Sequence, residues 1–499
     1  MKKQIDFMKA CSVLLILGLL LPCVFASCKK KTKVPEEPTK TEEEVNNNFT
    51  AVFGRQDYGG EVFRMAGVEA SSWEQYYDMR IVGNAESTDI LDVALYKRNA
   101  AVERSLNIQI EYVPLTEWLF TLSDYLNLCN LNGSCPFDTL LMVDRDAVTA
   151  ALNGDLYLYN DIPTVNLSNS WWSEVNEDIS MGGKYFFAYG NDSLHFLESA
   201  NVLVFNKTLA GAAGIEDLYA LVESHEWTLD KMFEVAAKVA ADDGDGIIND
   251  YDTFGIITEA DMFFPGIWQC SGIRLVEKDA NDMPYFNVPG NENFYTLMGN
   301  AFDQAYRERM IFQTLYDNPT NYTQAAFGNY ITAGDVMFAD GHALFRTVNL
   351  RGVMDLRRMD SDFGILPYPM GFEWQTDYIS RVYSGFPTVV PKTSTKVEMT
   401  GVVLEALACL ANEYYLPDYY DTMLKGHSVS DPESAKMLDI VFSTRTMDLG
   451  DTLWYDYIRL RYQDTLAKDR VKDLDGLTGA ITRGVNMIIN SCNEKLQGG

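Results

Sequence analysis

Short apolar runs alternate with amphipathic segments along residues 50–499. Residues 61–66 have the composition of a strand, and residues 137–143 form an apolar run around Asp138, as buried parallel strands do. Residues 90–106 place apolar side chains on one face at helical spacing. Residues 398–415 are also typical of a helix, which Pro417 would stop. This alternation predicts α/β layering.

Two further strands and one helix start follow from local patterns. Residues 107–112 alternate, and residues 202–205 form a second short apolar run. Thr228 is a plausible N-cap, with Asp230 in the first turn and an apolar stripe behind it. These segments add elements to the same α/β pattern.

The N-terminal 28 residues have the layout of an export signal. Lys2, Lys3 and Lys9 precede an apolar run over residues 11–24, which ends in Phe25-Ala26-Ser27-Cys28. The cysteine after the small pair resembles a lipoprotein signal box, although Phe25 stands where such boxes usually carry Leu. The alternative is a transmembrane helix, but the run is shorter than the roughly 20 apolar residues needed and contains Pro22. We therefore predict a signal peptide over residues 1–27 and acyl chains such as palmitate on Cys28.

The residues that follow Cys28 have the composition of a tether. Residues 28–49 are rich in Lys, Glu and Asn and contain two prolines, so they cannot bury a core. The remaining 450 or so residues are too many for one compact core and suit two or three lobes. The formal net charge of −31 argues against nucleic acid as a partner, because the field would repel it.

Cysteine and histidine usage argues against a metal centre built from these residues. The four histidines are scattered, and there is no CxxC motif. Cys129 and Cys135 bracket five residues and could close a small loop, while two buried free thiols are equally compatible with the sequence.

Motifs that would indicate catalysis are missing. The sequence contains no GxSxG, GxxxxGK[ST] or HExxH. With 71 Asp and Glu residues, some pair would lie at glycosidase spacing by chance, so the sequence singles out none. We predict that the protein is not an enzyme and requires no cofactor.

The sharpest local motif is the acidic loop at residues 241–252. Set against the calcium-loop pattern, four residues fall at ligand positions: Asp243, Asp245, Ile247 (through its carbonyl) and Asp252. Gly246 supplies the sharp turn, but Ala241 stands where a carboxylate is expected at the first position. A structural calcium ion and a solvated Asp/Gly turn are therefore both open.

Aromatic residues near predicted loops form the other signal. Trp171-Trp172 follow residues 162–167, and Trp73, Trp268 and Tyr383 lie near predicted loops or strand ends. Aromatic faces can stack on the C–H surfaces of sugars, whereas a single Trp is more often part of the core.

Several stretches, taken in order, resemble the extracellular solute-binding proteins of ABC importers, in the sugar-binding branch rich in lipoproteins. The resemblance spans roughly residues 50–495, and each piece alone is weak. The matching stretches are Leu95-Tyr96-Lys97-Arg98-Asn99, Asn153-Gly154-Asp155-Leu156, Trp171-Trp172, Val204-Phe205-Asn206-Lys207, Glu226-Trp227-Thr228-Leu229-Asp230, the acidic loop with Thr253-Phe254-Gly255, Asp362-Phe363-Gly364-Ile365-Leu366-Pro367-Tyr368-Pro369, Val390-Pro391-Lys392-Thr393-Ser394 and Asp431-Pro432-Glu433-Ser434-Ala435-Lys436-Met437-Leu438-Asp439.

The resemblance implies a two-lobed periplasmic-binding-protein-like fold with hinge strands and a ligand cleft between the lobes. By order of matching, residues 50–200 and 383–455 would form lobe one. Residues 201–382 and 456–499 would form lobe two. The cleft should be lined by loops beyond the strand ends, with these ligand-binding candidates: Glu69, Trp73, Asp144, Arg145, Asn191, Glu259, Trp268, Arg346, Asn349 and Tyr383.

The function that the resemblance implies is delivery of a carbohydrate, expected to be an oligosaccharide, to the permease subunits of an ABC transporter. The protein would be a monomer on the extracytoplasmic face of the cell membrane, held there by its lipid anchor. The alternatives are a receptor for another solute, such as a peptide, and an extracytoplasmic glycosidase.

Overall fold

The computed structural model describes residues 53–69, 79–356, 362–424 and 431–498. Cys28, the signal peptide and the tether lie outside these residues, as does Trp73. The description below concerns the compact unit formed within residues 46–499. Among the described residues, no helix has both the length and the apolar character needed to cross a bilayer.

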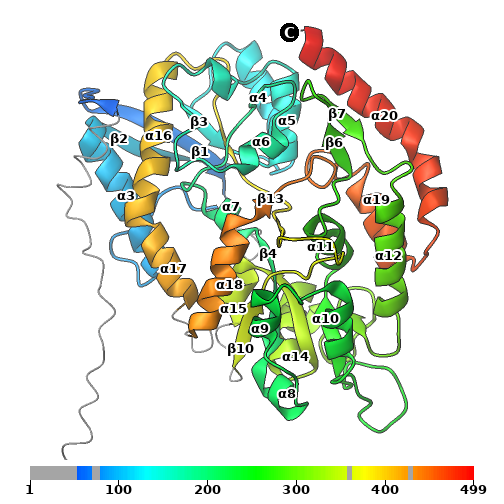
Figure 1. Ribbon diagram of the computed structural model, residues 1–499. Coiled ribbons are helices and arrows are strands. Elements are labelled where there is room, and N and C mark those ends of the chain that lie inside the picture. Colours follow the sequence, from blue (N-terminus) through cyan, green and yellow to red (C-terminus); the bar gives the residue numbers. More distant parts are fainter. Residues whose placement is uncertain (1–52, 70–78, 357–361, 425–430, 499) are drawn as a thin grey trace, which may run out of the picture. The chain divides into compact units, whose positions relative to one another are not determined.

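The first sheet is mostly parallel and has the strand order β12-β3-β1-β2. Its strands are β12 (Thr388–Val389), β3 (Thr139–Leu141), β1 (Glu61–Val68) and β2 (Ile108–Leu115). β1 pairs in parallel with β2 and β3, and β12 adds to β3 in the antiparallel direction. Helices α3 (Ile90–Leu106) and α16 (Val397–Tyr414) lie side by side next to this sheet (Figure 1).

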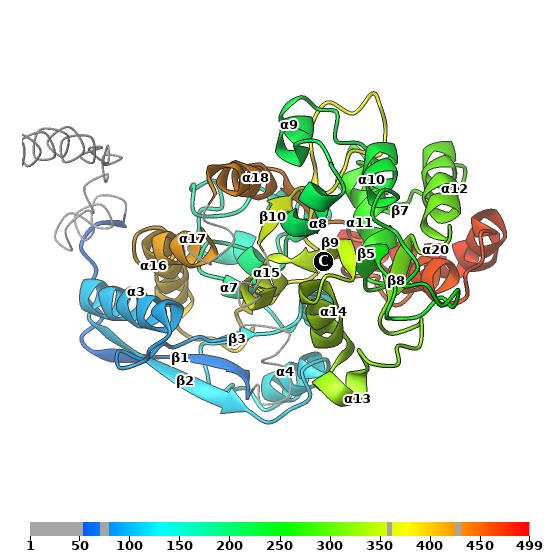
Figure 2. The ribbon, with the colours of Figure 1, turned by 90° about the horizontal axis from the view of Figure 1, so that it is seen from below.

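The second sheet is mixed and has the strand order β10-β4-β9-β5-β8. Its strands are β10 (Phe363–Leu366), β4 (Asn201–Asn206), β9 (Ala343–Asn349), β5 (Phe254–Thr258) and β8 (Ile311–Gln313). β5 is parallel to β8 and β9, whereas β4 is antiparallel to β9 and β10. Figure 2 shows this sheet and its helices beside the first sheet, each with its own covering layer.

Two short pairings and the remaining helices complete the structure. β11 (Ser380–Arg381) pairs with β13 (Arg445–Thr446), and β6 (Val276–Lys278) pairs with β7 (Pro284–Phe286). The helices are α4 (Leu122–Leu131), α5 (Asp144–Leu152), α6 (Val175–Ile179), α7 (Leu194–Glu198), α8 (Lys207–Ala212), α9 (Leu218–Glu223), α10 (Leu229–Ala236), α11 (Phe263–Cys270), α12 (Glu292–Ala305), α13 (Gln324–Phe327), α14 (Tyr330–Ala339), α15 (Leu350–Leu356), α17 (Leu416–Leu424), α18 (Pro432–Ser443), α19 (Arg459–Gln463) and α20 (Leu474–Gly498).

Most of the locally predicted elements are present, with one correction. The apolar run at residues 137–143 gives only a short strand, β3, because the chain leaves the sheet at Met142 and starts α5 at Asp144. The helix predicted over residues 398–415 is confirmed, since α16 ends at Tyr414. Pro417 lies in the first turn of the next helix, α17, where its missing N–H costs no hydrogen bond. Thr228 caps α10 as predicted, and its side chain accepts a hydrogen bond from the Lys231 N–H.

The strands of the two sheets come from different parts of the chain. The first sheet uses residues 61–141 and 388–389, and the second uses residues 201–366. Helix α18 packs on β10 of the second sheet, and the Ile365 N–H donates to the Ser434 hydroxyl. The lobe boundaries predicted from the resemblance stay a prediction.

Candidate ligand-binding site

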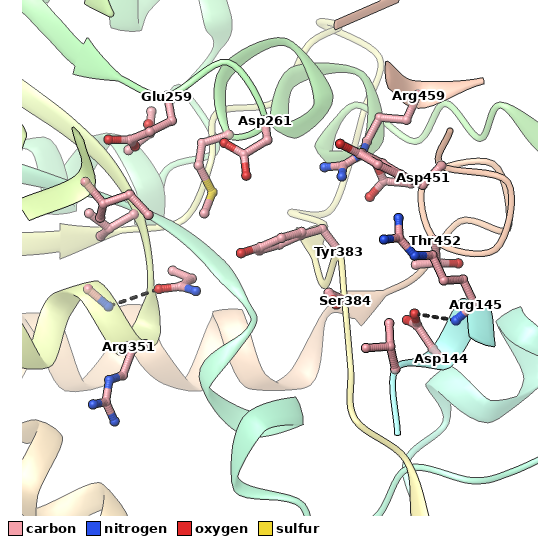
Figure 3. Close-up of a pocket in the computed structure, with 18 of the residues that line it drawn as sticks. Asp144, Arg145, Glu259, Asp261, Arg351, Tyr383, Ser384, Asp451, Thr452 and Arg459 are labelled. Carbon is pink, nitrogen blue, oxygen red and sulfur yellow. Dashed lines mark hydrogen bonds and ion pairs between the residues drawn. The ribbon is translucent and has the colours of Figure 1, made fainter. Parts of the chain in front are cut away.

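A cavity of about 520 Å³ lies where loops from both sheets meet (Figure 3). The first sheet supplies the residues after β3, and the second supplies the residues after β5 and along β9. The segments that follow β11 and β13 close one end. The volume is in the usual range for small-molecule sites. Aromatic and charged side chains dominate the lining, which includes Trp118, Phe120, Asp144, Arg145, Glu259, Asp261, Tyr330, Arg346, Asn349, Arg351, Asp355, Tyr383, Asp451, Tyr455 and Arg459.

On the wall formed by the second sheet, Arg346 is held by two carboxylates. Its Nη1 and Nη2 each lie 2.6 Å from an oxygen of Glu259, and its Nε lies 3.1 Å from Asp335 Oδ1. All three side chains are buried or nearly so. Burial raises the pKa of Glu259 to about 7, although Arg346 opposes this shift, and the two carboxylates raise the pKa of Arg346. Arg346 therefore stays charged and fixes the end of β5 against β9.

On the opposite wall, Asp144 is the first residue of α5 and faces the cavity from the end of β3. Burial raises its pKa to about 6, opposed by hydrogen bonds from the Arg145 and Gly385 N–H groups and the Tyr189 hydroxyl. The hydrogen bond from the Gly385 N–H, close to β12, thus fixes the Asp144 carboxyl between the ends of β3 and β12. The nearby Arg145 charge also opposes the rise in the pKa of Asp144.

Arginine and aromatic side chains alternate along the end of the cavity near β11. The Arg145 guanidinium lies 4.7 Å from the Phe120 ring centre and 5.1 Å from that of Tyr455. Arg459 lies 4.1 Å from the Tyr455 ring and 5.8 Å from the Tyr383 ring, over which Arg381 also lies, at 4.8 Å. We call this set (Phe120, Arg145, Tyr455, Arg459, Tyr383 and Arg381) the arginine–aromatic row. Cation–π contacts of this kind hold the rings with their faces fixed.

The structure brings six of the predicted ligand-binding residues to this cavity. They are Asp144, Arg145, Glu259, Arg346, Asn349 and Tyr383. Trp73 lies outside the described residues. A ligand in this cavity would not touch the other three, which are Glu69, Asn191 and Trp268.

Each of these three residues has a physical reason for lying elsewhere. Trp268 is fully buried on α11, a helix whose residues are all buried, and packs against Phe294. The Asn191 amide donates to Asn412 Oδ1 at 2.6 Å. Glu69 is exposed beyond β1 and extends the pairing with β2 through its backbone N–H.

The sequence did not point to several residues that line the cavity. Asp261 lies two residues after Glu259, so it would have been a candidate if the predicted site segment after β5 had extended two residues further. Trp118, Phe120, Asp451, Tyr455 and Arg459 come from irregular segments or a helix of five residues. Such segments carry no periodic pattern that would reveal them.

Trp171 and Trp172 belong to the core and not to the cavity. Both indole N–H groups donate to Glu405 of α16, at 2.6 and 3.0 Å. Glu405 also accepts hydrogen bonds from the Asn166 N–H and the Asn169 side-chain amide. These tryptophans therefore fasten a loop to α16.

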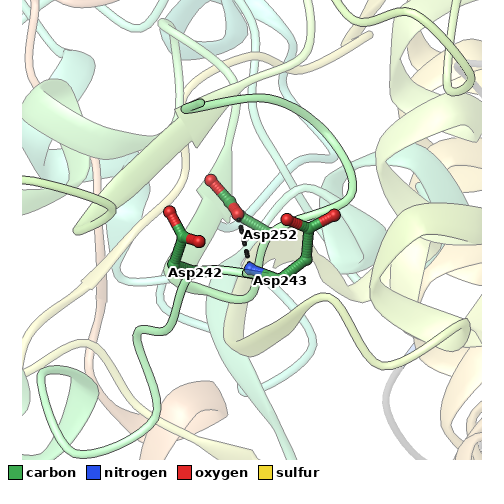
Figure 4. Close-up of side chains that lie close together, drawn as sticks. All are labelled: Asp242, Asp243 and Asp252. Atoms are coloured by element: carbon green, nitrogen blue, oxygen red, sulfur yellow. Dashed lines mark hydrogen bonds between the residues drawn. The ribbon is translucent and has the colours of Figure 1, made fainter. Parts of the chain in front are cut away.

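The acidic loop brings together three carboxylates, those of Asp242, Asp243 and Asp252 (Figure 4). The Arg309 guanidinium pairs with Asp242, and its Nε lies 2.8 Å from the buried Asp252. Arg309 thus supplies a positive charge where an ion was expected.

The other predicted calcium ligands are engaged within the loop or exposed. Asp245 Oδ1 accepts from the Ile247 N–H at 2.7 Å, and the Ile247 side chain is exposed. The structural calcium ion at residues 241–252 stays a prediction. Cys129 and Cys135 are free thiols in the structure, and the Cys135 sulfur accepts from the Thr393 hydroxyl.

Comparison with known proteins places the fold. No family model and no curated protein matches the sequence. The sugar-binding protein MalE from Xanthomonas citri matches 88% of this chain and 100% of its own at 13% identity, with a TM-score of 0.58. ABC substrate-binding protein Lmo0181 from Listeria monocytogenes, in complex with cycloalternan, covers 86% and 99% at 12% identity and a TM-score of 0.52. UgpB from Mycobacterium tuberculosis, in complex with glycerophosphocholine, covers 87% and 99% at 14% identity and a TM-score of 0.52.

These similarities define a class of fold. The chain has the two-lobed α/β architecture of the periplasmic-binding-protein type, with its cavity where the two sheets' loops meet. The fold predicted from the sequence is confirmed.

Buried carboxyls in the cavity wall and behind it predict a pH dependence of stability. The pKa values of Asp144 and Asp335 are raised by burial to about 6, and that of Glu259 to about 7, above their ordinary values of 3.8 and 4.5. Groups with a raised pKa take up protons more readily in the folded state, so their stabilisation is present at low pH and lost as pH rises through 6–7. We expect the free energy of unfolding to be roughly 3 kcal/mol higher at pH 5.5 than at pH 7.5. Urea unfolding at the two pH values measures it, and equal or lower stability at pH 5.5 would contradict these shifts.

Proposed function

We propose that the protein is an extracellular solute receptor that binds a carbohydrate, expected to be an oligosaccharide, and delivers it to the permease of an ABC transporter. It binds without covalent chemistry, and closure of the two lobes encloses the ligand. A lipid on Cys28 would hold it at the outer face of the cell membrane, with residues 28–49 as the tether. The observation that carries the proposal is the cavity where both sheets' loops meet, in a fold shared with sugar-binding receptors.

The chemistry of the lining supports a hydroxylated ligand. The Tyr383 and Tyr455 rings are held at fixed orientation by guanidinium groups. Such faces can stack on the C–H surface of a sugar ring. Carboxylate and guanidinium groups nearby can accept from and donate to hydroxyls, because hydrogen bonds to charged groups are the stronger ones.

A thermal-shift screen tests the proposal. We expect neutral oligosaccharides to raise Tm, because a ligand that binds only the folded state stabilises it. Tripeptides and glycerophosphocholine serve as the competing classes of solute. Stabilisation by one of these alone would replace the carbohydrate with another ligand.

Recovery of the ligand separates a receptor from a glycosidase. After prolonged incubation with a stabilising oligosaccharide, chromatography should return the sugar at its original length. Shorter products would show that the protein is an enzyme.

A further inference from the structure

Arg459 has hydrogen-bonding capacity that the protein does not use. Its side chain is 8% exposed and lies between the Tyr455 and Tyr383 rings. Among the described residues, its Nε and Nη1 have no hydrogen-bond partner. A buried donor left unsatisfied costs free energy, and for a charged group the cost is larger. Arg459 is one of the residues that line the cavity, so its guanidinium is placed where a ligand oxygen can supply an acceptor.

The nearest carboxylate is already committed to another arginine. Both oxygens of Asp451 accept from Arg381, at 2.8 and 3.0 Å. Arg459 Nε is 3.3 Å from Asp451 Oδ1, which is an ion-pair distance without hydrogen-bond geometry. One buried carboxylate therefore serves two guanidinium groups, and one positive charge at this end of the cavity is left over.

Asp261 supplies the complementary unused acceptor. Its backbone carbonyl accepts from Arg381 Nη1 at 2.8 Å, which fixes the residue at this end of the cavity. Within the described part of the chain, no hydrogen bond or ion pair engages its half-buried carboxylate. In Figure 3, the Asp261 carboxylate and Arg459 both lie near Tyr383. The Asp261 charge also contributes to the raised pKa of Tyr455, the ring under Arg459.

We infer that Arg459 and Asp261 form a two-point anchor for neighbouring hydroxyl groups of a neutral saccharide. One sugar oxygen accepts from the Arg459 guanidinium, and the adjacent hydroxyl donates to the Asp261 carboxylate. The extra positive charge of the Arg381–Asp451–Arg459 group is balanced by Asp261, so the ligand need not carry charge. A uronate at this end would face Asp261, and an ammonium group would face Arg459. The inference rests on the proposed carbohydrate function and specifies that the sugar unit at this end of the cavity is neutral.

Isothermal titration at pH 7.5 with maltotriose, cellotriose, xylotriose and trigalacturonic acid tests the anchor. For the neutral trisaccharide that binds best, we expect R459Q and D261N each to raise Kd about 10- to 100-fold, since each removes a charge-assisted hydrogen bond. R461Q is the matched control, because Arg461 is exposed on the same short helix, and its Kd should equal that of the wild type. R459K keeps the charge but not the planar pair of donors, and we expect about a tenfold loss. It serves in place of R459Q if that variant does not fold.

The outcomes separate the anchor from the function. A neutral sugar bound equally well by wild type, R459Q and D261N would overturn the anchor and leave the receptor function standing. Tighter binding of trigalacturonic acid than of every neutral sugar would overturn the neutral end group. If none of the four sugars binds the wild type, the carbohydrate function fails, and the anchor for sugar hydroxyls fails with it.

Discussion

Replacing Arg346 with Met is expected to lower the free energy of unfolding by about 3–5 kcal/mol at pH 7.5. Arg346 is fully buried and is the counter-charge paired with both Glu259 and Asp335, so its removal leaves two carboxylates in the core without that partner. Met is shorter than Arg but is apolar and fills most of its volume, so the loss reports mainly the missing charge. Urea unfolding followed by tryptophan fluorescence measures the change.

The pH dependence of the same variant identifies the cause. At pH 5.5 the two carboxyls take up protons, so the difference between R346M and the wild type should shrink. A second variant, R346M/E259Q, removes one of the stranded charges and should recover part of the loss. Arg307 is exposed, and R307M should change stability by less than about 0.5 kcal/mol. A loss of the same size at both pH values would assign the effect to packing.

Local elements were predictable because their signals are local. The apolar spacing over residues 90–106 coincides with α3, and the hydroxyl of Thr228 caps α10 because it lies three residues before the N–H that it accepts from. These local elements predict only α/β layering, whereas the two-lobed fold was implied by the resemblance of several stretches, taken in order, to solute-binding proteins.

The site was only partly predictable, because its contacts join distant residues. Glu259 and Arg346 were each predicted to contact ligand as strand-end residues, but the sequence does not show that they pair with each other. Trp268 was assigned to a loop, whereas α11 is apolar on every side and therefore buried. Arg459 could not be found, since the unused nitrogens that distinguish it depend on Asp451 being taken by Arg381.

Replacing Glu405 is also expected to lower stability strongly, because this one buried carboxylate fastens the Trp171–Trp172 loop to α16. We expect E405Q to lower the free energy of unfolding by about 2–4 kcal/mol. The amide keeps one accepting oxygen and places an NH₂ group against donors that include the Trp171 or Trp172 indole N–H. Urea unfolding measures the loss, and tryptophan emission of the folded protein reports the changed environment of the indoles.

The control for this variant comes from the same helix. Glu398 is exposed in the first turn of α16, so E398Q removes a charge without removing a buried hydrogen bond and should stay within about 0.5 kcal/mol of the wild type. W171F removes one of the four donors to Glu405 and should cost less than E405Q. Equal stability of E405Q and E398Q would mean that the hydrogen bonds to Glu405 contribute nothing net. In that case the packing of the two indole rings alone would hold the loop against α16.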